Sequence, residues 1–277
     1  MNSISKEIFV SVAMTTFNGE SFLREQLDSL LGQSYENFEI IISDDGSKDG
    51  THEILNEYQT KDSRIKWVLN PNPNGFIKNF EYVIGLCRGE IIFLCDQDDI
   101  WYSEKISKHV DIYKSNKDIH WVYNRVILID DEDKEIGFLE DSAPDYYKKR
   151  KLLYSTWGSC VLGCATSYRS KLLKSVLPIG KYAPAHDSWI QLAIFPKKSF
   201  YINEVLQSYR QHCKNVVGWG KEIDTNVLKE REKQAISDNL RYLKCLSTNR
   251  NLTLGKRLFF LVVYFVKLIR NILTSYK

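Results

Sequence analysis

The chain has 277 residues and a formal net charge of +3, with 43% hydrophobic and 26% charged residues. These proportions exclude a wholly disordered chain, and the length suits one large domain with an appendage or two modest domains. The six cysteines include no CxxC pair, which argues against a disulfide framework or a zinc site and predicts thiols in a reducing compartment.

The first hundred residues alternate strand-like and helix-like segments. Short apolar runs rich in β-branched residues are typical of buried parallel strands, and they occur at residues 8–16, 38–43, 65–69 and 90–95. Between them, helical patterns occupy residues 22–31, 51–58 and 76–87. This βαβαβαβ order predicts an α/β fold in which an open parallel sheet carries helices on both faces.

The middle of the chain has a less regular pattern. We expect strands at residues 121–129 and 199–207, the first of them followed by an acidic turn at 130–133. Between these strands, residues 160–169 suggest a loop that enters a strand, and residues 187–195 suggest a short helix.

The C-terminal part differs in composition. Residues 221–246 form a charged helical stretch, and the nine consecutive apolar residues at 258–266 are too few to span a bilayer, which needs about 20. From residue 239 onward there are eight basic residues and no acidic ones, so the positive charge is concentrated in this tail. We therefore expect a catalytic domain at residues 1–217 and a helical, basic segment at 218–277.

The basic side chains of residues 255–277 fall on one side of a helical wheel, with aromatic and aliphatic side chains on the rest. This pattern is typical of a helix that lies in a membrane interface. The alternative is a helix that docks on the catalytic domain or on a second subunit of a homodimer. The N-terminus shows no secretion signal, so we expect a cytoplasmic protein at the inner face of the membrane. We expect no nucleic-acid partner.

Polar residues follow three of the predicted strands where each strand ends. They are residues 15–18 after the first strand, Asp44 and Asp45 after the second, and residues 96–99 after the fourth. Ligands of open parallel sheets bind outside the carboxyl ends of the strands. The three clusters therefore predict a single site at one edge of the sheet.

Asp96 and Asp98 carry the strongest chemical signal. On a strand, residues i and i+2 point to the same side, so both carboxylates can face one ion. Carboxylate oxygens suit Mg²⁺ or Mn²⁺, which bind through one or two carboxylates and substrate phosphates. A solvated acidic turn is the alternative, but three aspartates in four residues would then repel one another without gain. The pair predicts a cation that neutralises charge on a leaving diphosphate.

Several other candidates are open to two interpretations each. Carboxylates after the second strand can accept hydrogen bonds from a base or ribose, although Asp-Asp-Gly-Ser is also common in turns and helix caps. Lys78 is either a donor contact or part of a solvated helix start. His212 either ligates the metal or closes over the diphosphate with the help of Arg210, and a structural hydrogen bond is the alternative.

Six motifs in this order resemble glycosyltransferase family 2. Three lie in the first hundred residues: AMTTFNGE at 13–20, ISDDGSKDGT at 42–51 and FLCDQDDIW at 93–101. Three later ones resemble the bacterial rhamnosyltransferase-like branch: GCATSY at 163–168, HDSWI at 186–190 and YRQHCKN at 209–215. The resemblance implies the GT-A fold, in which a Rossmann-like nucleotide-binding sheet is joined to an acceptor half.

The resemblance also implies roles for individual residues on the donor side. The nucleotide pocket would be lined by Thr15, Phe17 and Asn18, and Asp45 with Asp44 would hold the base and ribose. Asp98 would be the principal metal ligand beside Asp96.

On the acceptor side, Asp187 matches the catalytic base of the family. The preceding residue, His186, stands where the family often has an acid. As a general base, Asp187 would deprotonate an acceptor hydroxyl as it attacks the anomeric carbon. A single displacement of this kind inverts the anomeric centre.

Three other classes of protein are alternatives to a glycosyltransferase. A nucleotidyltransferase would be expected to carry a Gly-rich loop with Arg or Lys after the first strand, and residues 15–20 have neither. A dinucleotide oxidoreductase needs GxGxxG at that turn, which is absent. A non-catalytic module that binds nucleotide-sugars or glycans is left open by the motifs.

We therefore expect an inverting glycosyltransferase that depends on Mn²⁺ or Mg²⁺. By branch resemblance its donor would be dTDP-rhamnose, and UDP-galactose or UDP-glucose is the alternative. The acceptor would be a hydroxyl of a growing cell-surface polysaccharide, and the basic tail favours a glycan linked to lipid.

Overall fold

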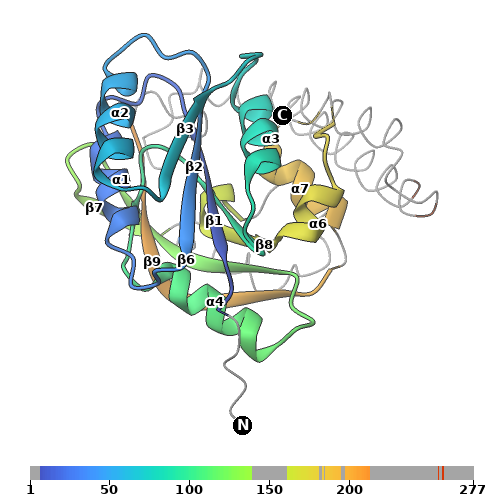
Figure 1. Cartoon of the computed structure of the whole chain (residues 1–277). Helices are drawn as coiled ribbons and strands as arrows, with labels where there is room; N and C mark the ends of the chain where they lie inside the picture. The colour runs from blue at the N-terminus through green and yellow to red at the C-terminus, as the bar shows by residue number, and fades with distance from the viewer. Residues whose placement is uncertain are drawn as a thin grey trace, which may run out of the picture.

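The computed structural model describes residues 7–138, 161–180, 183, 185–194, 197–212, 255 and 258 (Figure 1). The first elements are β1 (Val10–Thr16), α1 (Leu23–Leu31), β2 (Phe38–Asp44), α2 (Thr51–Lys61), β3 (Ile65–Leu69), α3 (Phe76–Leu86) and β4 (Ile91–Cys95). They are followed by β5 (Ile100–Trp101), α4 (Lys105–Ser115), β6 (Trp121–Ile129) and β7 (Glu135–Phe138). The last are η1 (Gly163–Ala165), β8 (Thr166–Arg169), α6 (Ser170–Ser175), α7 (His186–Ile194) and β9 (Ser199–Arg210).

Within these ranges the strands form one nine-stranded sheet in the order β3-β2-β1-β4-β8-β6-β9-β5, and β7 pairs with β6. β1 is parallel to both β2 and β4, and β2 is parallel to β3, as the alternation of strands and helices predicts. Beyond β4, where the sequence analysis gave no strand directions, the sheet is mixed. β8 is antiparallel to β4 and β6, and β5 is antiparallel to β9. The connection 96–99 is too short for the crossover helix that would place β5 parallel to β4.

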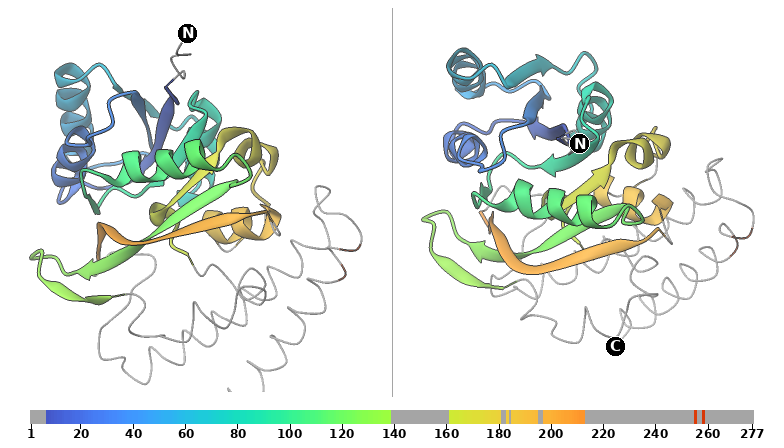
Figure 2. Two further views of the ribbon diagram at one scale, coloured as in Figure 1. Left: turned by 90° about the horizontal axis from the view of Figure 1, so that it is seen from below. Right: turned by 60° about the horizontal axis from the view of Figure 1, so that its bottom comes forward.

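Each face of the sheet carries its own apolar core. Along β1, Val12 and Met14 pack with α1, α2 and α4, whereas Ala13 packs with α3, α6 and α7. Figures 1 and 2 show α1 and α2 on the opposite side of the parallel strands from α3. Because both faces are covered, β1, β2 and β4 are buried at every residue, which explains their continuous apolar sequences.

Within the described residues, the predicted helices and strands agree with the observed ones to within three residues at their ends, and the helical stretch predicted at 221–246 lies outside those residues. The sequence analysis did not predict α4, although Ile106, Val110 and Tyr113 recur at helical spacing and are buried against the sheet. It also did not predict β5, β7 or α6, which are short.

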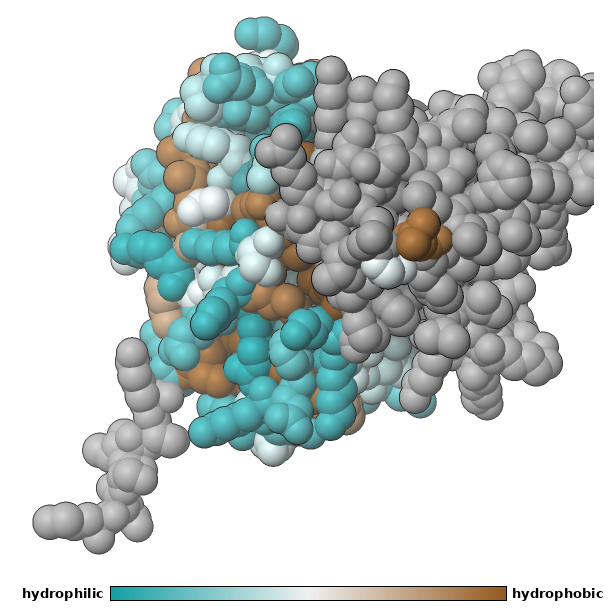
Figure 3. Space-filling view, turned by 90° about the vertical axis from the view of Figure 1, so that its right-hand side faces the viewer, coloured by the Kyte–Doolittle hydropathy of each residue, from teal (hydrophilic) through white to brown (hydrophobic). Residues whose placement is uncertain are grey.

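The predicted C-terminal segment, 218–277, lies outside the described residues except for Gly255 and Leu258. Among the residues that the structure does describe, no helix is long and apolar enough to cross a bilayer. On the described part of the face in Figure 3, hydrophobic side chains are interspersed among hydrophilic ones.

Glu39 is a buried carboxylate that ties β2 to the amino end of β4. It accepts hydrogen bonds from Ser11 Oγ at 2.7 Å and from the Arg88 backbone N–H at 2.9 Å, and Arg88 Nη2 lies 2.5 Å from its second oxygen. Burial alone would raise the pKa of Glu39, but the hydrogen bonds from Arg88 and Ser11 outweigh it and lower the pKa below its ordinary value of 4.5. The charged form is therefore the one that the fold favours.

We predict that Glu39→Gln lowers the free energy of unfolding by roughly 1–3 kcal/mol at pH 7, because a charge-assisted network loses its acceptor. Since the folded pKa is lowered, this stabilisation is present above pH 4.5 and is lost as the pH falls through the folded value. Urea unfolding of both proteins from pH 7 to pH 3 should show the difference shrinking. The exposed Glu36→Gln change is the control, and a difference that does not vary with pH would contradict the assignment.

Candidate active site

The loops after β1, β2 and β4 meet at the carboxyl edge of the parallel strands. We call residues 96–99, between β4 and β5, the acidic loop. Its Gln97 side chain accepts a hydrogen bond from Phe17 N–H at 2.8 Å and donates one to the Phe17 carbonyl at 3.1 Å. The Asp45 N–H donates to the Thr16 carbonyl at 2.9 Å. The predicted gathering of the three clusters at one edge is therefore confirmed.

Asn18 joins the first two of these loops. Its N–H donates to Ser47 Oγ and its Oδ1 accepts from the Lys48 N–H, both at 2.8 Å. Its φ of 49° lies in the left-handed region, which asparagine tolerates better than most residues. The neighbouring Phe17 is 54% exposed at the edge of the sheet, whereas Thr15 is nearly buried. Phe17 is thus available to contact a ligand.

Asp44 is fully buried, and both of its oxygens are occupied within the chain. One oxygen accepts from the Gly46 and Ser47 N–H groups and lies 2.8 Å from His52 Nε2, while the other accepts from the Thr16 and Ser47 hydroxyls. Burial would raise the pKa of Asp44, but the hydrogen bonds from Ser47, His52 and Thr16 lower it. Asp44 therefore holds the loop together and has no free acceptor site for the base or ribose contact expected from the sequence.

Asp45 is half-buried and anchors the loop that leads into α3. It accepts hydrogen bonds from Asn70 Nδ2 at 3.1 Å, Asn74 N–H at 3.3 Å and Gly75 N–H at 2.8 Å. Gly75 has a φ of +80°, which glycine adopts without strain. A carboxylate has about four acceptor positions, so one position of Asp45 remains for a ligand.

The acidic loop does not continue the strand. β4 ends at Cys95, and residues 96–99 form a bend before β5. Asp96 and Asp98 therefore do not alternate on a strand, and the prediction that they face the same way for that reason is wrong. The bend instead places ligand atoms of Asp96, Asp99 and Cys164 within 4.8 Å of one another.

The electrostatics of Asp96 show how closely the acids are packed. Burial, together with repulsion from Asp98 and Asp187, raises the pKa of Asp96 to about 7. The pKa of Asp99 is also raised, first by burial and then by Asp98 and Asp96. A cation would relieve this repulsion, and carboxylate oxygens suit Mg²⁺ or Mn²⁺. Burial raises the pKa of the Cys164 thiol, so the carboxylates are the better ligands here.

Asp98 faces His212 at the end of β9. His212 Nε2 lies 2.8 Å from Asp98 Oδ2, and both side chains are mostly buried. The His212 ring also packs against Phe22, with ring centroids 4.9 Å apart. Asp98 and His212, both expected to bind the metal, are thus neighbours beside the acidic loop.

Arg210 holds the acidic loop from the same strand. Its side chain is 1% exposed, and the guanidinium donates to Glu25 Oε2 at 2.6 Å, Asp133 Oδ1 at 2.5 Å and the Asp98 carbonyl at 2.9 Å. Its backbone N–H donates to Asp99 Oδ1 at 3.2 Å. In this structure Arg210 is a positioning residue, which differs from the donor contact expected from the sequence.

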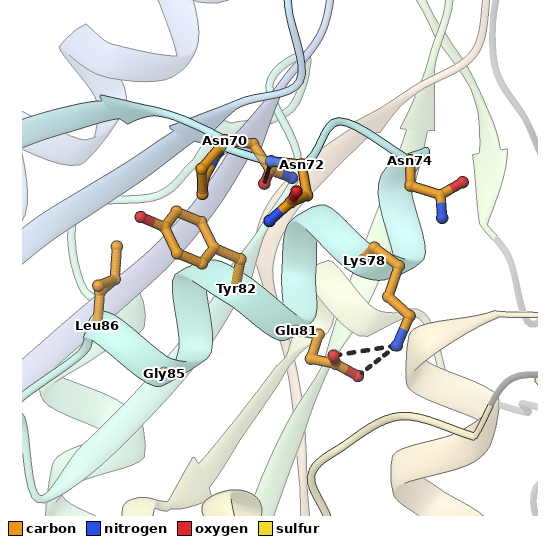
Figure 4. Close-up of a pocket in the computed structure, with 9 residues that line it drawn as sticks. Asn70, Asn72, Asn74, Lys78, Glu81, Tyr82, Gly85 and Leu86 are labelled. Atoms are coloured by element: carbon orange, nitrogen blue, oxygen red, sulfur yellow. Dashed lines mark hydrogen bonds and ion pairs between the residues drawn. The ribbon is translucent and has the colours of Figure 1, made fainter.

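Lys78 lines a pocket of about 570 Å³ between α3 and the loop that precedes it (Figure 4). Its ammonium lies 3.0 Å from both oxygens of Glu81, one turn further along α3. The other lining residues include Asn72 and Tyr82 but none of the acidic loop. Lys78 is therefore engaged in an ion pair, and its pocket is separate from the carboxylate cluster.

Asp187 occupies the first turn of α7, close enough to the acidic loop to raise the pKa of Asp96. Its Oδ2 accepts from the Gly163 N–H at 3.2 Å. The preceding residue, His186, is buried and stacked on Phe80 with centroids 3.8 Å apart, and among the described residues neither ring nitrogen has a hydrogen-bond partner. Burial lowers the pKa of His186.

Sequence reasoning missed four residues of this site: Asp99, Cys164, Lys105 and Gln207. The first two lie within recognised motifs and offered a signal. Lys105 Nζ donates to the Cys164 carbonyl at 2.7 Å and to the Gln207 side chain, and both Lys105 and Gln207 are fully buried. A lysine on a helix and a glutamine on a strand are ordinarily exposed, so nothing local indicated their burial.

Comparison with known proteins agrees with this geometry. Residues 11–177 match the family described as "Glycosyl transferase family 2". The chain is 32% identical to an uncharacterised glycosyltransferase of Rickettsia typhi over 212 residues, which cover 73% of this chain and 64% of that protein. It is 29% identical to one of Methanocaldococcus jannaschii, over 73% of this chain and 70% of that protein. The chain thus spans less than two thirds of the Rickettsia relative.

Solved structures show a similar fold at low sequence identity. S. aureus TarS 1–349 in complex with UDP-GlcNAc has a TM-score of 0.64 and 17% identity, over 93% of this chain and 72% of that chain. The mannosyltransferase PcManGT from Pyrobaculum calidifontis, in complex with GDP-Man and Mn²⁺, has a TM-score of 0.61 and 14% identity, over 96% and 88%. From its family match and its mixed α/β sheet, the chain belongs to glycosyltransferase family 2 and has the GT-A fold.

Proposed function

We propose that the chain transfers a sugar from a nucleoside-diphosphate-sugar to a hydroxyl acceptor with inversion, using a divalent cation. The observation that carries this proposal is the acidic bend, where ligand atoms of Asp96, Asp99 and Cys164 lie within 4.8 Å of one another and Asp98 and Asp187 raise the pKa of Asp96. Buried carboxylates that raise one another's pKa are costly unless a cation joins them.

On the donor side, Thr15, Phe17, Asn18 and Asp45 form the nucleoside contact in this proposal. Phe17 offers an exposed ring, and Asp45 offers the remaining acceptor position to a base N–H or ribose hydroxyl. Solved proteins of similar fold bind UDP-GlcNAc or GDP-Man, which supports a nucleotide-sugar donor. Lys78 would reach the donor only after leaving Glu81.

The cation would be held by Asp96 and Asp98, with His212 beside them and Asp99 behind. When bound, such a cation neutralises charge on the departing diphosphate. Mn²⁺ accepts both carboxylate and imidazole ligands, and Mg²⁺ favours oxygen. The Mn²⁺ in the structurally similar mannosyltransferase is consistent with this assignment.

On the acceptor side, Asp187 is the proposed general base. Its position near the acidic loop would let it take the proton of a hydroxyl that attacks the anomeric carbon from the face opposite the diphosphate. The buried His186 ring, stacked on Phe80, would hold the start of α7 in place beneath Asp187. A single displacement of this kind inverts the anomeric configuration.

The finer assignments rest on the sequence motifs. We propose rhamnose from dTDP-rhamnose as the first donor, with galactose or glucose from UDP as the alternative. The acceptor would be a lipid-linked cell-surface glycan. Residues 1–217 would form the catalytic domain, and residues 255–277 would hold it at the cytoplasmic face of the membrane or, alternatively, join two subunits.

We predict that the full chain releases nucleoside diphosphate from one of these donors in the presence of Mn²⁺ and that chelation stops the release. Asp98→Ala should lower the rate at least about a hundredfold, because a cation contributes several kcal/mol to the transition state. A coupled assay of diphosphate release over dTDP-rhamnose, UDP-hexoses, UDP-GlcNAc and GDP-mannose measures this.

The exposed Asp118→Asn change is the control for this experiment. A protein that retains a donor without releasing nucleoside diphosphate would be a binding module, which is the alternative that the motifs leave open.

We predict that Asp187→Asn lowers the rate of transfer by about 10²–10⁴-fold, because the amide cannot accept the acceptor's proton. Donor affinity, measured by calorimetry with a non-hydrolysed nucleotide, should stay unchanged because Asp187 lies on the acceptor side. Asp131→Asn, at an exposed position, is the matched control. Wild-type transfer by Asp187→Asn would remove Asp187 from the mechanism.

We also predict that the full chain floats with vesicles that contain anionic lipid and that deletion of residues 255–277 abolishes this flotation. Basic residues near a membrane surface each contribute roughly 1 kcal/mol to binding. Raised salt should weaken the binding. If the full chain stays unbound and elutes as a dimer, the docking alternative holds.

A further inference from the structure

Lys105 is a fully buried lysine beneath the acidic loop, at the first residue of α4. Its Nζ donates to the Cys164 carbonyl at 2.7 Å and to Gln207 Oε1, and it lies 3.5 Å from the centroid of the Trp101 ring. Few lysines are fully buried, because the ammonium loses its hydration. A buried ammonium therefore requires negative charge or dipoles nearby.

The contacts of Lys105 lead directly to the acidic loop. Gln207, which accepts from Lys105, donates through Nε2 to Asp99 Oδ2 and to Cys164 Sγ, both at 3.3 Å. Lys105, Gln207 and Asp99 thus form a continuous hydrogen-bonded chain from α4 through β9 to the acidic loop. Every member is buried.

Without the Lys105 ammonium, the negative charges around these hydrogen bonds would lack a balancing positive charge. After burial, Asp98 raises the pKa of both Asp96 and Asp99, and Lys105 lowers that of Asp96. In the described part of the chain, the buried lysine and arginine side chains are Lys105 and Arg210. The guanidinium of Arg210 pairs with Glu25 and Asp133 and donates to the Asp98 carbonyl, whereas Lys105 is linked through Gln207 to the Asp99 carboxylate.

We propose that Lys105 is the internal counter-ion of the acidic loop, which keeps the loop assembled in the metal-free protein and weakens its affinity for the divalent cation. This inference rests on the proposed cation site. Like charges repel strongly where water is excluded, so the ammonium near these carboxylates disfavours the binding of a divalent cation to them. Lys105 is a positioning residue, because it reaches the carboxylates through Gln207.

Replacing Lys105 by a neutral residue should have opposite effects on stability without metal and on Mn²⁺ affinity. Lys105→Gln should lower the melting temperature of the full chain in EDTA, since the carboxylates lose their buried partner. The same variant should bind Mn²⁺ at least about tenfold more tightly than wild type, because the competing charge is gone. Saturating Mn²⁺ should restore most of the lost melting temperature.

The experiment titrates metal-free protein with Mn²⁺ alone by calorimetry and follows thermal unfolding with EDTA or Mn²⁺. Lys105→Arg, which keeps the charge, should resemble wild type in Mn²⁺ affinity. Lys108→Gln is the matched control, because Lys108 lies on the same helix with an exposed ion pair to Glu204 and should change neither quantity.

The outcomes separate this inference from the proposed function. If wild type binds Mn²⁺ and Lys105→Gln binds it equally or more weakly, the counter-ion role is wrong. If wild type itself fails to bind Mn²⁺, the cation site of the proposed function is wrong and this inference falls with it. Should Lys105→Gln not fold in EDTA, the double variant with Asp99→Asn should fold, because one buried charge is removed. Failure of that rescue would also overturn the proposal.

Discussion

Repulsion among carboxylates at one bend is the constraint on which the rest of this site depends. Asp96 and Asp99 lie so close together after β4 that their ligand atoms are within 4.8 Å, and burial and the charge of Asp98 disfavour the ionisation of both. Such a cluster stays together only if surrounding groups hold it. In this protein they are the Arg210 backbone and guanidinium, the Gln207 amide and the Lys105 ammonium. All three come from α4 or β9, which lie outside the parallel half of the sheet.

The loop after β2 is organised differently. All hydrogen-bond acceptor positions of Asp44 are occupied, whereas those of the next residue, Asp45, are not. Asp44 receives five contacts in a fully buried position and so makes the loop after β2 rigid. Asp45 accepts three hydrogen bonds from the loop before α3 and has one acceptor position left. Asp44 therefore supports the loop, and Asp45 retains an acceptor position that a ligand can use. The difference arises from burial, because only Asp45 reaches the surface.

The site is assembled from both halves of the sheet. β1, β2 and β4 bring the nucleotide-side loops and the acidic loop to one edge, and β9 adds His212 and Arg210 from the far half. α7 adds Asp187 next to an imidazole that has no partner. A buried polar group without a partner is unfavourable, so the start of α7 is less well satisfied than the loop after β2.

The sequence by itself determined the alternating strands and helices of the parallel half, the edge where its loops meet and the presence of acids there, because hydrophobic period and parallel topology are local properties. It also singled out Asp187 and His212 through motif resemblance. Only the tertiary structure decided the antiparallel half, the bend that redirects Asp96 and Asp98, the burial of Asp44 and Arg210, and the place of Lys105. Most of these features depend on pairing between distant segments, such as Lys105 with Gln207 about a hundred residues apart, and no local pattern records which distant partner will bury a charge.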